Sequence, residues 1–305
     1  MNNTEVKGVL VPALTPFLSN QQPHVDAFVH HCQWLLHQGA DGLAIFGTTS
    51  EANSLGCEER MELLEILIEN GIPANRIIPG TGTCALTDSV RLTRHATQRG
   101  CAGVLMLPPF YYKGVSDEGL FGAYSHVVEQ LGDDRLRIYL YHIPPVSQVG
   151  LSLKLVEQLV KTYPSTIAGL KDSGGDWQHT ALLLKEFPEL SIFPGSETFL
   201  LAGLRHGGAG CITATGNVNP AGIRRVFEQW QSKDADKLQA QITRIRQIIQ
   251  SYAMIPALKS IVASNRQDPD WLRVRPPLVQ LDEALQNKLL AELGQIGFSM
   301  ASHSR

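Results

Sequence analysis

The sequence lacks the patterns that indicate a disulfide framework or a metal site. It has no Cys-x-x-Cys pair, and its histidines form no His-x-His or His-x-x-x-His pair, the spacings that bring two ligands to one ion. Because the cysteines are scattered singly and odd in number, we expect them to be reduced and mostly buried. They are Cys32, Cys57, Cys84, Cys101 and Cys211. The sequence therefore favours a protein without a metal and without disulfides.

Long apolar runs and basic runs are also absent. No stretch of about 18 apolar residues occurs, as a membrane-spanning helix needs, and the N-terminal residues 1–7 are polar, unlike a signal peptide. The chain has 26 basic and 29 acidic residues, a formal net charge of -3, with no basic patch. We therefore expect neither a membrane nor nucleic acid as a partner, and we expect the protein in the cytoplasm.

Short apolar runs alternate with amphipathic helical stretches over the first two thirds of the 305 residues. This alternation is typical of βα units around a parallel sheet. Residues 104–107 and 138–141 are apolar without a break, which is typical of strands buried on both faces. The pattern predicts eight strands, at residues 8–11, 42–46, 76–80, 103–107, 137–141, 167–171, 191–194 and 210–213.

Eight parallel strands with helical crossovers predict a closed barrel. The helical patterns between them lie at residues 25–38, 58–70, 87–99, 117–130, 153–162, 176–187 and 197–206. A doubly wound open sheet usually carries a glycine-rich fingerprint after its first strand, whereas residues 12–16 read Pro-Ala-Leu-Thr-Pro. We therefore predict an α/β protein with a (β/α)8 TIM barrel over residues 1–225.

The pattern changes after residue 214 to helices without strands. Helical periodicity occurs at residues 219–231, 235–252, 256–263 and 281–296. The first of these supplies the eighth barrel helix. We predict that residues 226–305 form a C-terminal helical extension packed on the barrel, with packing on a neighbouring subunit as the alternative.

Lys171 ends the sixth predicted strand, after the apolar residues 167–170. Barrel enzymes place their active sites at the carboxyl ends of the strands, so its amine is expected in the barrel mouth. Burial disfavours the ammonium form and favours a free amine that can attack a carbonyl carbon. The structural alternative is a strand-end lysine paired with a carboxylate such as Asp172.

Other strand ends carry residues suited to the same chemistry. Tyr141 ends the neighbouring strand, where its hydroxyl could shuttle protons, or its ring could simply fill the barrel. Thr48 and Thr49 open a turn whose amides and hydroxyls could hold a carboxylate, or cap a helix. Tyr111 could relay protons through Thr48, or only pack. Together these residues predict a covalent imine between Lys171 and a small 2-keto acid, without a cofactor.

With these residues in place, the chain resembles the superfamily of dihydrodipicolinate synthase and N-acetylneuraminate lyase, whose members are class I Schiff-base barrels. The resemblance covers nearly the whole length. It is carried by six motifs in family order, namely Gly47-Thr48-Thr49-Ser50-Glu51, Gly80-Thr81-Gly82, Pro109-Phe110-Tyr111-Tyr112, Tyr141-His142-Ile143-Pro144, Gly169-Leu170-Lys171-Asp172 and Gly195-Ser196-Glu197.

The resemblance implies a role for each site residue. Lys171 would be the Schiff-base lysine and Tyr141 the proton donor and acceptor, with Thr48 and Tyr111 as the relay; the relay tyrosine would come from a neighbouring subunit. The keto-acid carboxylate would bind to Thr48 and Thr49, and the pyruvyl pocket would be lined by Gly195 and Ile212. The resemblance also implies a homotetramer built as a dimer of dimers.

Two positions depart from true dihydrodipicolinate synthases and concern the second-substrate pocket. Val146 stands where the resemblance implies an arginine that grips the aldehyde's carboxylate, a contact worth about 1.5–3 kcal/mol. Asp172 and Ser173 after the lysine are similar to aldolases and dehydratases of 2-keto-3-deoxy sugar acids. We therefore expect the chain to lie closer to the sugar-acid aldolases.

The expected activity is that of a lyase joining or separating pyruvate and an aldehyde. Dihydrodipicolinate (4-hydroxy-tetrahydrodipicolinate) synthesis from pyruvate and aspartate semialdehyde is the first alternative, with Arg275 or Lys113 doing the arginine's work. A sugar-acid dehydratase acting through the same imine is the second. A keto-acid-binding barrel that has lost catalysis is the alternative from a different class, and a metal-dependent aldolase lacks the clustered histidine ligands that it needs.

Overall fold

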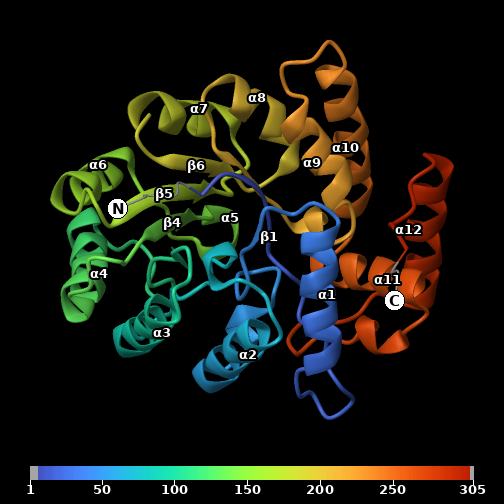
Figure 1. The fold of residues 1–305 in the computed structure, drawn as a ribbon, viewed down its shortest axis with the longest axis horizontal. Coiled ribbons are helices and arrows are strands. Elements are labelled where there is room, and N and C mark those ends of the chain that lie inside the picture. The colour runs from blue at the N-terminus through green and yellow to red at the C-terminus, as the bar shows by residue number, and fades with distance from the viewer. Residues whose placement is uncertain (1–5, 303–305) are drawn as a thin grey trace.

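The structure is a computed structural model that describes residues 6–302. Parallel strands lie at its centre with helices around them (Figure 1). Two groups of strands are hydrogen-bonded in the orders β2-β1-β7 and β3-β4-β5-β6. The strands are β1 (Gly8–Val11), β2 (Gly42–Leu43), β3 (Val104–Met106), β4 (Ile138–His142), β5 (Ile167–Asp172), β6 (Ser191–Pro194) and β7 (Gly210–Ile212).

The segment predicted as a strand at residues 76–80 joins the two groups without being a regular strand, so that part of the prediction is wrong in detail. Arg76 belongs to the short 3-10 helix η2 (Ala74–Arg76), and Pro79 has no N–H to donate. Single bridges nevertheless link Ile77 to Leu43 and Gly80 to Leu105. The segment therefore lies between β2 and β3 and, with the seven regular strands, completes the eight strand positions of the barrel.

On the opposite side, the gap between β6 and β7 is closed through Ala209, the residue before β7, which bonds to β6 and to β1. Ala209 N donates to the Ile192 carbonyl at 3.0 Å, and the Ala209 carbonyl accepts from Gly8 N at 2.8 Å. The strand positions thus surround one interior, and the predicted (β/α)8 barrel is confirmed.

Side chains from almost every strand position fill this interior. They are fully buried, and they are Leu10, Ala44, Ile78, Leu105, Tyr139, Phe193 and Ile212. At the corresponding position β5 has Gly169, which adds no side chain to the interior. The Tyr139 ring fills this space, since a Cβ atom on Gly169 would lie 2.7 Å from it. The barrel is a packed core, so any ligand must bind at one of its ends.

Amphipathic helices cover the outside of the barrel. Those between the strands are α1 (Val25–His37), α2 (Cys57–Glu69), α3 (Leu86–Gln98), α4 (Asp117–Leu131), α6 (Leu153–Thr162), α7 (Trp177–Glu186) and α8 (Leu200–Arg205). Hydroxyl caps start two of them, because the Ser116 side chain accepts from Gly119 N and the Ser152 side chain accepts from Leu155 N. The short helix α5 (Pro144–Ser147) follows β4.

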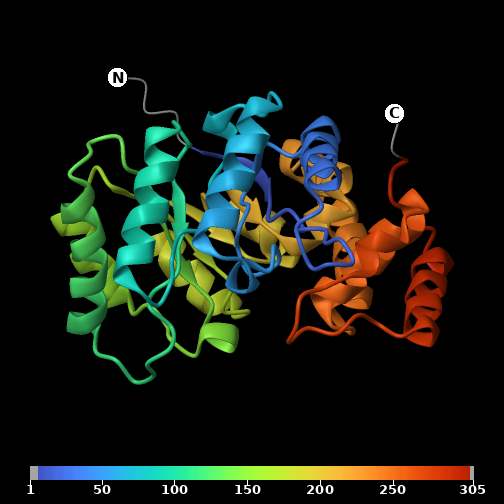
Figure 2. The same cartoon turned by 90° about the horizontal axis from the view of Figure 1, so that it is seen from below.

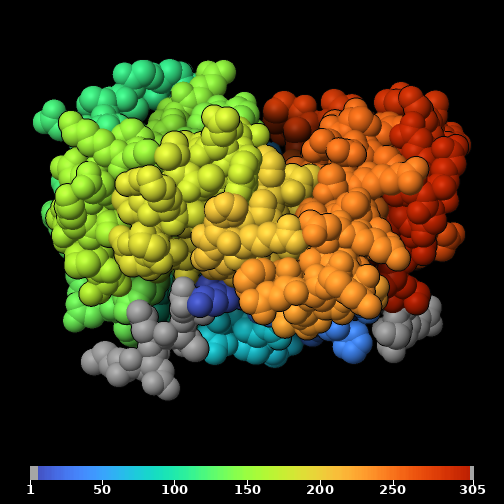
Figure 3. Space-filling model, turned by 90° about the horizontal axis from the view of Figure 1, so that it is seen from above, coloured from blue at the N-terminus to red at the C-terminus, as the bar shows by residue number. Residues whose placement is uncertain are grey.

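The C-terminal helices pack together at one side of the barrel (Figure 2). They are α9 (Pro220–Glu228), α10 (Ala235–Gln250), α11 (Met254–Arg266) and α12 (Glu283–Gln295). In the space-filling view, this segment lies directly against the barrel helices (Figure 3). The division that we predict at residue 225 falls within α9 and stays a prediction. Among residues 6–302, no helix is long and apolar enough to span a bilayer.

Gln239 attaches helix α10 to the segment that follows β6. Its amide nitrogen donates to the Glu197 carbonyl at 2.9 Å, and its amide oxygen accepts from Leu201 N at 3.0 Å. Glu197 lies in the 3-10 helix η3 (Glu197–Phe199) that follows β6. One face of α10 therefore becomes part of the barrel mouth.

Candidate active site

A cavity of about 560 Å³ opens at the carboxyl ends of the strands. Its wall includes the predicted catalytic and substrate-binding residues Thr48, Thr49, Tyr141, Lys171 and Gly195. A second hollow of about 550 Å³ lies at the opposite ends of the strands, beside Arg137 and Ser191. We take the first as the candidate active site, because parallel barrels carry their catalytic groups at the carboxyl end.

Lys171 and Tyr141 are brought together by the register of β4 and β5. The two residues are direct partners in the parallel pairing. Lys171 Nζ donates to the Tyr141 hydroxyl at 3.2 Å, and both side chains are buried. Tyr141 OH lies in turn 3.3 Å from Thr48 Oγ1. The strand ends thus hold an amine and two hydroxyls in one hydrogen-bonded chain.

The alternative of a Lys171–Asp172 ion pair does not match the geometry. Successive side chains on a strand point to opposite faces, so Asp172 turns away from the amine. Its carboxylate accepts from the Thr180 hydroxyl at 2.7 Å, from His179 Nδ1 at 3.0 Å and from Gly174 N at 2.9 Å. In the described part of the chain, no carboxylate pairs with Lys171.

The phenol of Tyr141 is electrostatically coupled to the lysine. Burial alone would raise the pKa of Tyr141, but the Lys171 ammonium and the hydrogen bond with Thr48 outweigh it, so the pKa lies below its usual value of 10. A phenol with a lowered pKa gives and takes protons more readily near neutral pH.

The turn at Thr48 and Thr49 presents free backbone donors. Neither amide donates to another group within residues 6–302, whereas the Gly47 carbonyl accepts from two later amides. Phe46, with a φ of 57°, sets the direction of this turn. A Cβ atom on Gly80 would lie 2.0 Å from the Phe46 carbonyl oxygen, so only glycine fits there. The two amides therefore form a ready site for a carboxylate.

A buried ion pair ties this turn to the C-terminal helices. Glu51, also in a left-handed conformation, accepts a hydrogen bond from Lys259 on α11, and both side chains are fully buried. The Glu51 carboxylate also accepts from Arg275 N at 2.9 Å. Burial lowers the pKa of Lys259 to about 8, although the Glu51 carboxylate opposes that shift. The extension thus holds one end of the candidate site.

Tyr111 and Ile212 lie outside the cavity wall of their own chain. Tyr111 is 73% exposed and contacts the ring of Tyr112 edge-on, with centroids 5.4 Å apart. Its position agrees with a relay tyrosine that acts in a neighbouring subunit, but that role stays a prediction. Ile212 is fully buried in the barrel interior, in register with Leu10.

The predicted second-substrate residues all border the cavity. Val146 is 62% exposed on α5, at the rim. Ser173 lies beside Gly195, where a Cβ atom would come 2.0 Å from the serine Oγ. Asp172 reaches the wall, but its carboxylate is fully buried beneath it.

The two cations considered as substitutes for the missing arginine point elsewhere. Arg275 donates to both oxygens of Glu59, at 2.9 and 2.5 Å. Lys113 Nζ donates to the carbonyls of Phe110 and Ser147. Neither lines the cavity.

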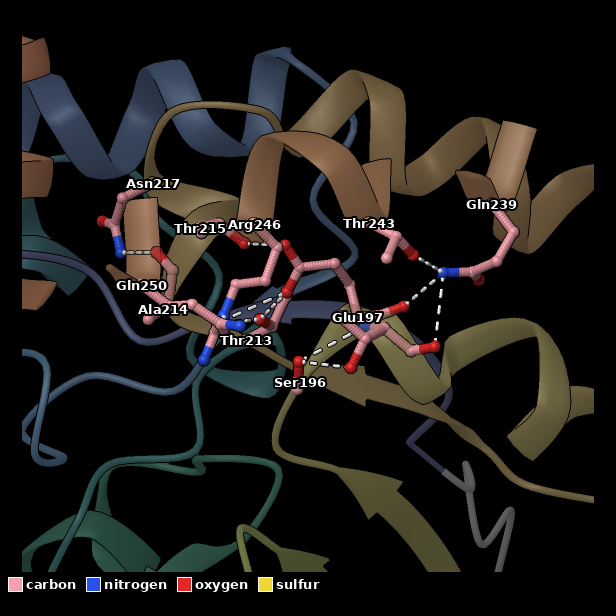
Figure 4. A network of polar contacts seen from close by, with 11 residues as sticks. Ser196, Glu197, Thr213, Ala214, Thr215, Asn217, Gln239, Thr243, Arg246 and Gln250 are labelled. Atoms are coloured by element: carbon pink, nitrogen blue, oxygen red, sulfur yellow. Dashed lines mark hydrogen bonds and ion pairs between the residues drawn. The ribbon is translucent and has the colours of Figure 1, made fainter. Parts of the chain in front are cut away.

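A cation that sequence reasoning missed does line the cavity. Arg246 reaches toward the mouth from α10, on the same helix as Thr243 and Gln250 (Figure 4). Gln247 lines the cavity as well. Its Nη1 lies 3.4 Å from Glu197 Oε2 and 3.3 Å from Thr213 Oγ1. The signal that could have found it is a polar stripe at positions 243, 246, 247 and 250, since this spacing places all four on one helical face.

Behind Lys171 lies a cluster of His142, Asp172 and His179. The two rings stack at 4.5 Å, and His142 Nδ1 accepts from Leu151 N at 3.0 Å. The candidate ligand atoms of the three lie within 4.8 Å of one another, but a metal ion there would have to displace the hydrogen bonds that these groups already make. The hydrogen bond to Asp172 raises the pKa of His179 more than burial lowers it.

Comparisons with known proteins agree with this geometry. The model of the dihydrodipicolinate synthetase family matches residues 5–296. The chain belongs to this family. Members of the family are lyases, so the chain is an enzyme of this class, and the catalytically silent barrel loses its support.

Relatives within the family cover most of the chain. An uncharacterised DapA-like lyase of Chloroflexus aurantiacus is 33% identical over 91% of this chain and 92% of its own length. The crystal structure of dihydrodipicolinate synthase from Agrobacterium tumefaciens is 32% identical, covers 95% of this chain and 99% of that one, and has a TM-score of 0.88. The family protein YagE from Escherichia coli K12, in complex with pyruvate, is 25% identical, covers 95% and 98%, and has a TM-score of 0.86.

Proposed function

We propose that the protein is a cofactor-free class I lyase in which Lys171 forms a Schiff base with pyruvate. The enzyme would cleave or form a carbon–carbon bond between pyruvate and an aldehyde. The observation that carries this proposal is the 3.2 Å contact between Lys171 Nζ and Tyr141 OH, in a cavity at the barrel mouth where no described carboxylate pairs with the amine. An amine beside a hydroxyl that can shuttle protons suits imine formation.

The proposed steps use only groups at the strand ends. The amine attacks the keto carbon, and the carbinolamine loses water as Tyr141 gives a proton to the departing oxygen. In the direction of cleavage, the phenolate takes the proton of the hydroxyl on C4, the bond between C3 and C4 breaks, and the aldehyde leaves. The enamine then gains a proton at C3, and hydrolysis returns pyruvate and the free lysine.

The pyruvate carboxylate would lie on the free amides of Thr48 and Thr49. Two amides that donate to nothing else in the described residues can each give a hydrogen bond to a carboxylate oxygen. The pyruvate complex of the E. coli relative supports pyruvate as the keto acid. Gly195 would line the pyruvyl pocket, and a side chain at this position would clash with Ser173.

For the larger substrate, we propose a 2-keto-3-deoxy sugar acid or a related hydroxy-keto acid. Val146 offers no cation at the rim, and Ser173, Thr243 and Gln247 offer neutral groups suited to hydroxyls. Dihydrodipicolinate synthesis is the second candidate, and the synthase relative at 32% identity supports it. A dehydratase would use the same imine. A homotetrameric assembly and a cytoplasmic location complete the proposal.

Trapping with borohydride tests the imine directly. Pyruvate and borohydride together should add one reduced pyruvyl group at Lys171, and Lys171→Met should abolish the adduct. The matched control is Lys113→Met, which removes another lysine near the barrel mouth and should leave the adduct unchanged. An adduct at Lys113 or Lys259, or none at all, would contradict the proposal.

A further inference from the structure

The cavity contains a second cation that the proposed chemistry does not use. Arg246 lines the same wall as Lys171, and its side chain is 14% exposed. Among residues 6–302, the only carboxylate residue on that wall is Asp172, whose oxygens are turned away and satisfied by other donors. When Lys171 carries pyruvate, the keto-acid carboxylate offsets the charge of the iminium. The keto-acid part of the substrate then leaves no negative charge to pair with Arg246.

The contact between Arg246 and Glu197 does not saturate the guanidinium. Glu197 is buried and already accepts hydrogen bonds from the hydroxyls of Thr213 and Thr215 (Figure 4). The arginine approaches it only through Nη1, at 3.4 Å, whereas charge-assisted hydrogen bonds typically measure about 2.7–2.9 Å. Arg246 Nε donates to Gln250 at 3.3 Å, and among residues 6–302 nothing accepts from Nη2.

Arg205 shows how an arginine that ties α8 to α10 is bonded. Arg205 on α8 donates through both Nη atoms to Asp236 on α10, at 2.9 and 2.8 Å. Gln239 fastens the same helix to the turn at Glu197. Since α10 is already anchored by these contacts, docking of the helix does not require Arg246.

We propose that Arg246 binds an anionic group, most simply a carboxylate, at the far end of the aldehyde substrate. Glu197, Thr213 and Thr215 position the guanidinium, and its Nη2 is free to meet the anion. This inference rests on the proposed Schiff-base function and narrows its substrates to those whose aldehyde part carries a second negative charge, as in a sugar acid with a further carboxylate at the end far from the keto group. Arg246 on α10 would thus supply the cation that the rim lacks at Val146 on α5.

The test compares an anionic acceptor with its uncharged counterpart. Condensation with pyruvate is measured for 4-oxobutanoate and for 4-oxobutanamide, which differ only in the terminal group. We expect the wild type to prefer the carboxylate. Arg246→Met should lower kcat/KM for 4-oxobutanoate by about 10- to 150-fold and leave the amide almost unchanged, as loss of one charged hydrogen-bonding partner predicts. Arg246→Lys, which keeps the charge without the fork, should fall between.

The controls separate this inference from a structural role and from the proposed function. Arg205→Met removes an ion pair to the same helix outside the cavity and should change neither acceptor's kcat/KM. Equal losses for both acceptors in Arg246→Met, or no preference for the carboxylate in the wild type, would overturn the inference. So would a fall in pyruvate trapping in Arg246→Met, because the arginine would then hold the keto acid. A wild type that traps no pyruvate would instead overturn the Schiff-base function.

Discussion

The two cations of the cavity come from regions built in different ways. Lys171 stands at the end of a strand, and the register with β4 places it beside Tyr141. Arg246 stands on a helix that comes after the barrel in the chain and reaches the mouth only because α10 packs over η3. The first region needs only backbone pairing to form, whereas the second needs the docking of a whole helix.

This difference separates imine formation, which is the same for every substrate, from the choice of aldehyde, which can vary. A strand end is held on both sides by the barrel, so it suits an amine and a phenol that must stay within hydrogen-bond reach. A docked helix can change its polar face without disturbing the strands. We infer that the choice of aldehyde depends mainly on the wall that α10 provides, whereas the strand ends determine the rate for every aldehyde.

The largest expected effect belongs to the strand-end region. Tyr141→Phe removes the hydroxyl next to Lys171 and should lower kcat by about 10²–10⁴-fold, the usual contribution of a positioned acid–base group. Initial rates with either acceptor measure this. The loss should be the same for both acceptors, unlike the selective loss in Arg246→Met.

A buried hydroxyl elsewhere provides the control. Tyr124 on α4 is as buried as Tyr141 and donates to the Met106 carbonyl, outside the cavity. Tyr124→Phe should reduce stability and leave kcat unchanged. Equal rates for Tyr141→Phe and Tyr124→Phe would refute the role of the phenol.

The next effect tests whether the extension supports the strand ends. Lys259→Met leaves the buried carboxylate of Glu51 without its ion partner, which should lower the free energy of unfolding by about 3–5 kcal/mol. Urea denaturation measures it. Because burial makes both charges costly, the double variant Lys259→Met/Glu51→Gln should recover much of this loss. A double variant no more stable than the single one would show that the pair is not the cause.

Much of the strand-end region could be predicted from the sequence. An apolar run followed by Lys171, and a similar run ending at Tyr141, are local patterns, and parallel strands align their carboxyl ends. Pairing of these neighbours therefore followed from the order of the strands. The run at residues 76–80 was harder to assign, because Pro79 interrupts its ladder while leaving the strand position occupied.

The wall from α10 could not be predicted in the same way. The polar stripe that contains Arg246 is typical of a solvated helix face, and only tertiary packing decides whether such a face meets solvent or a cavity. Arg275 and Lys113 are the cations that the sequence offers for this role, but their partners hold both away from the mouth. The pairing of Lys259 with Glu51 joins residues 208 positions apart, which no local pattern reveals.

The smallest expected effect concerns the cluster that supports Lys171 from behind. The hydrogen bond to Asp172 holds the pKa of His179 above its usual 6.5, so the folded state favours the protonated ring. A base with a raised folded-state pKa stabilises the protein below the unfolded pKa, and that stabilisation is lost as the pH rises through the folded value. His179→Gln should therefore cost about 0.5–1 kcal/mol of unfolding free energy below pH 6.5, and less at higher pH.

The comparison must be made between the two proteins at each pH, because two neighbours of His179 also titrate. Burial holds the pKa of His142 below 6.5. The pKa of Asp172 is raised by burial but lowered more by its hydrogen bonds from His179 and Thr180. Urea denaturation of the wild type and His179→Gln between about pH 5 and 8.5 isolates the His179 contribution. If the difference grows with pH, His179 is not held protonated by Asp172. Unchanged kcat/KM in this variant would show that the cluster of His142, Asp172 and His179 stabilises the strand ends and takes no part in catalysis.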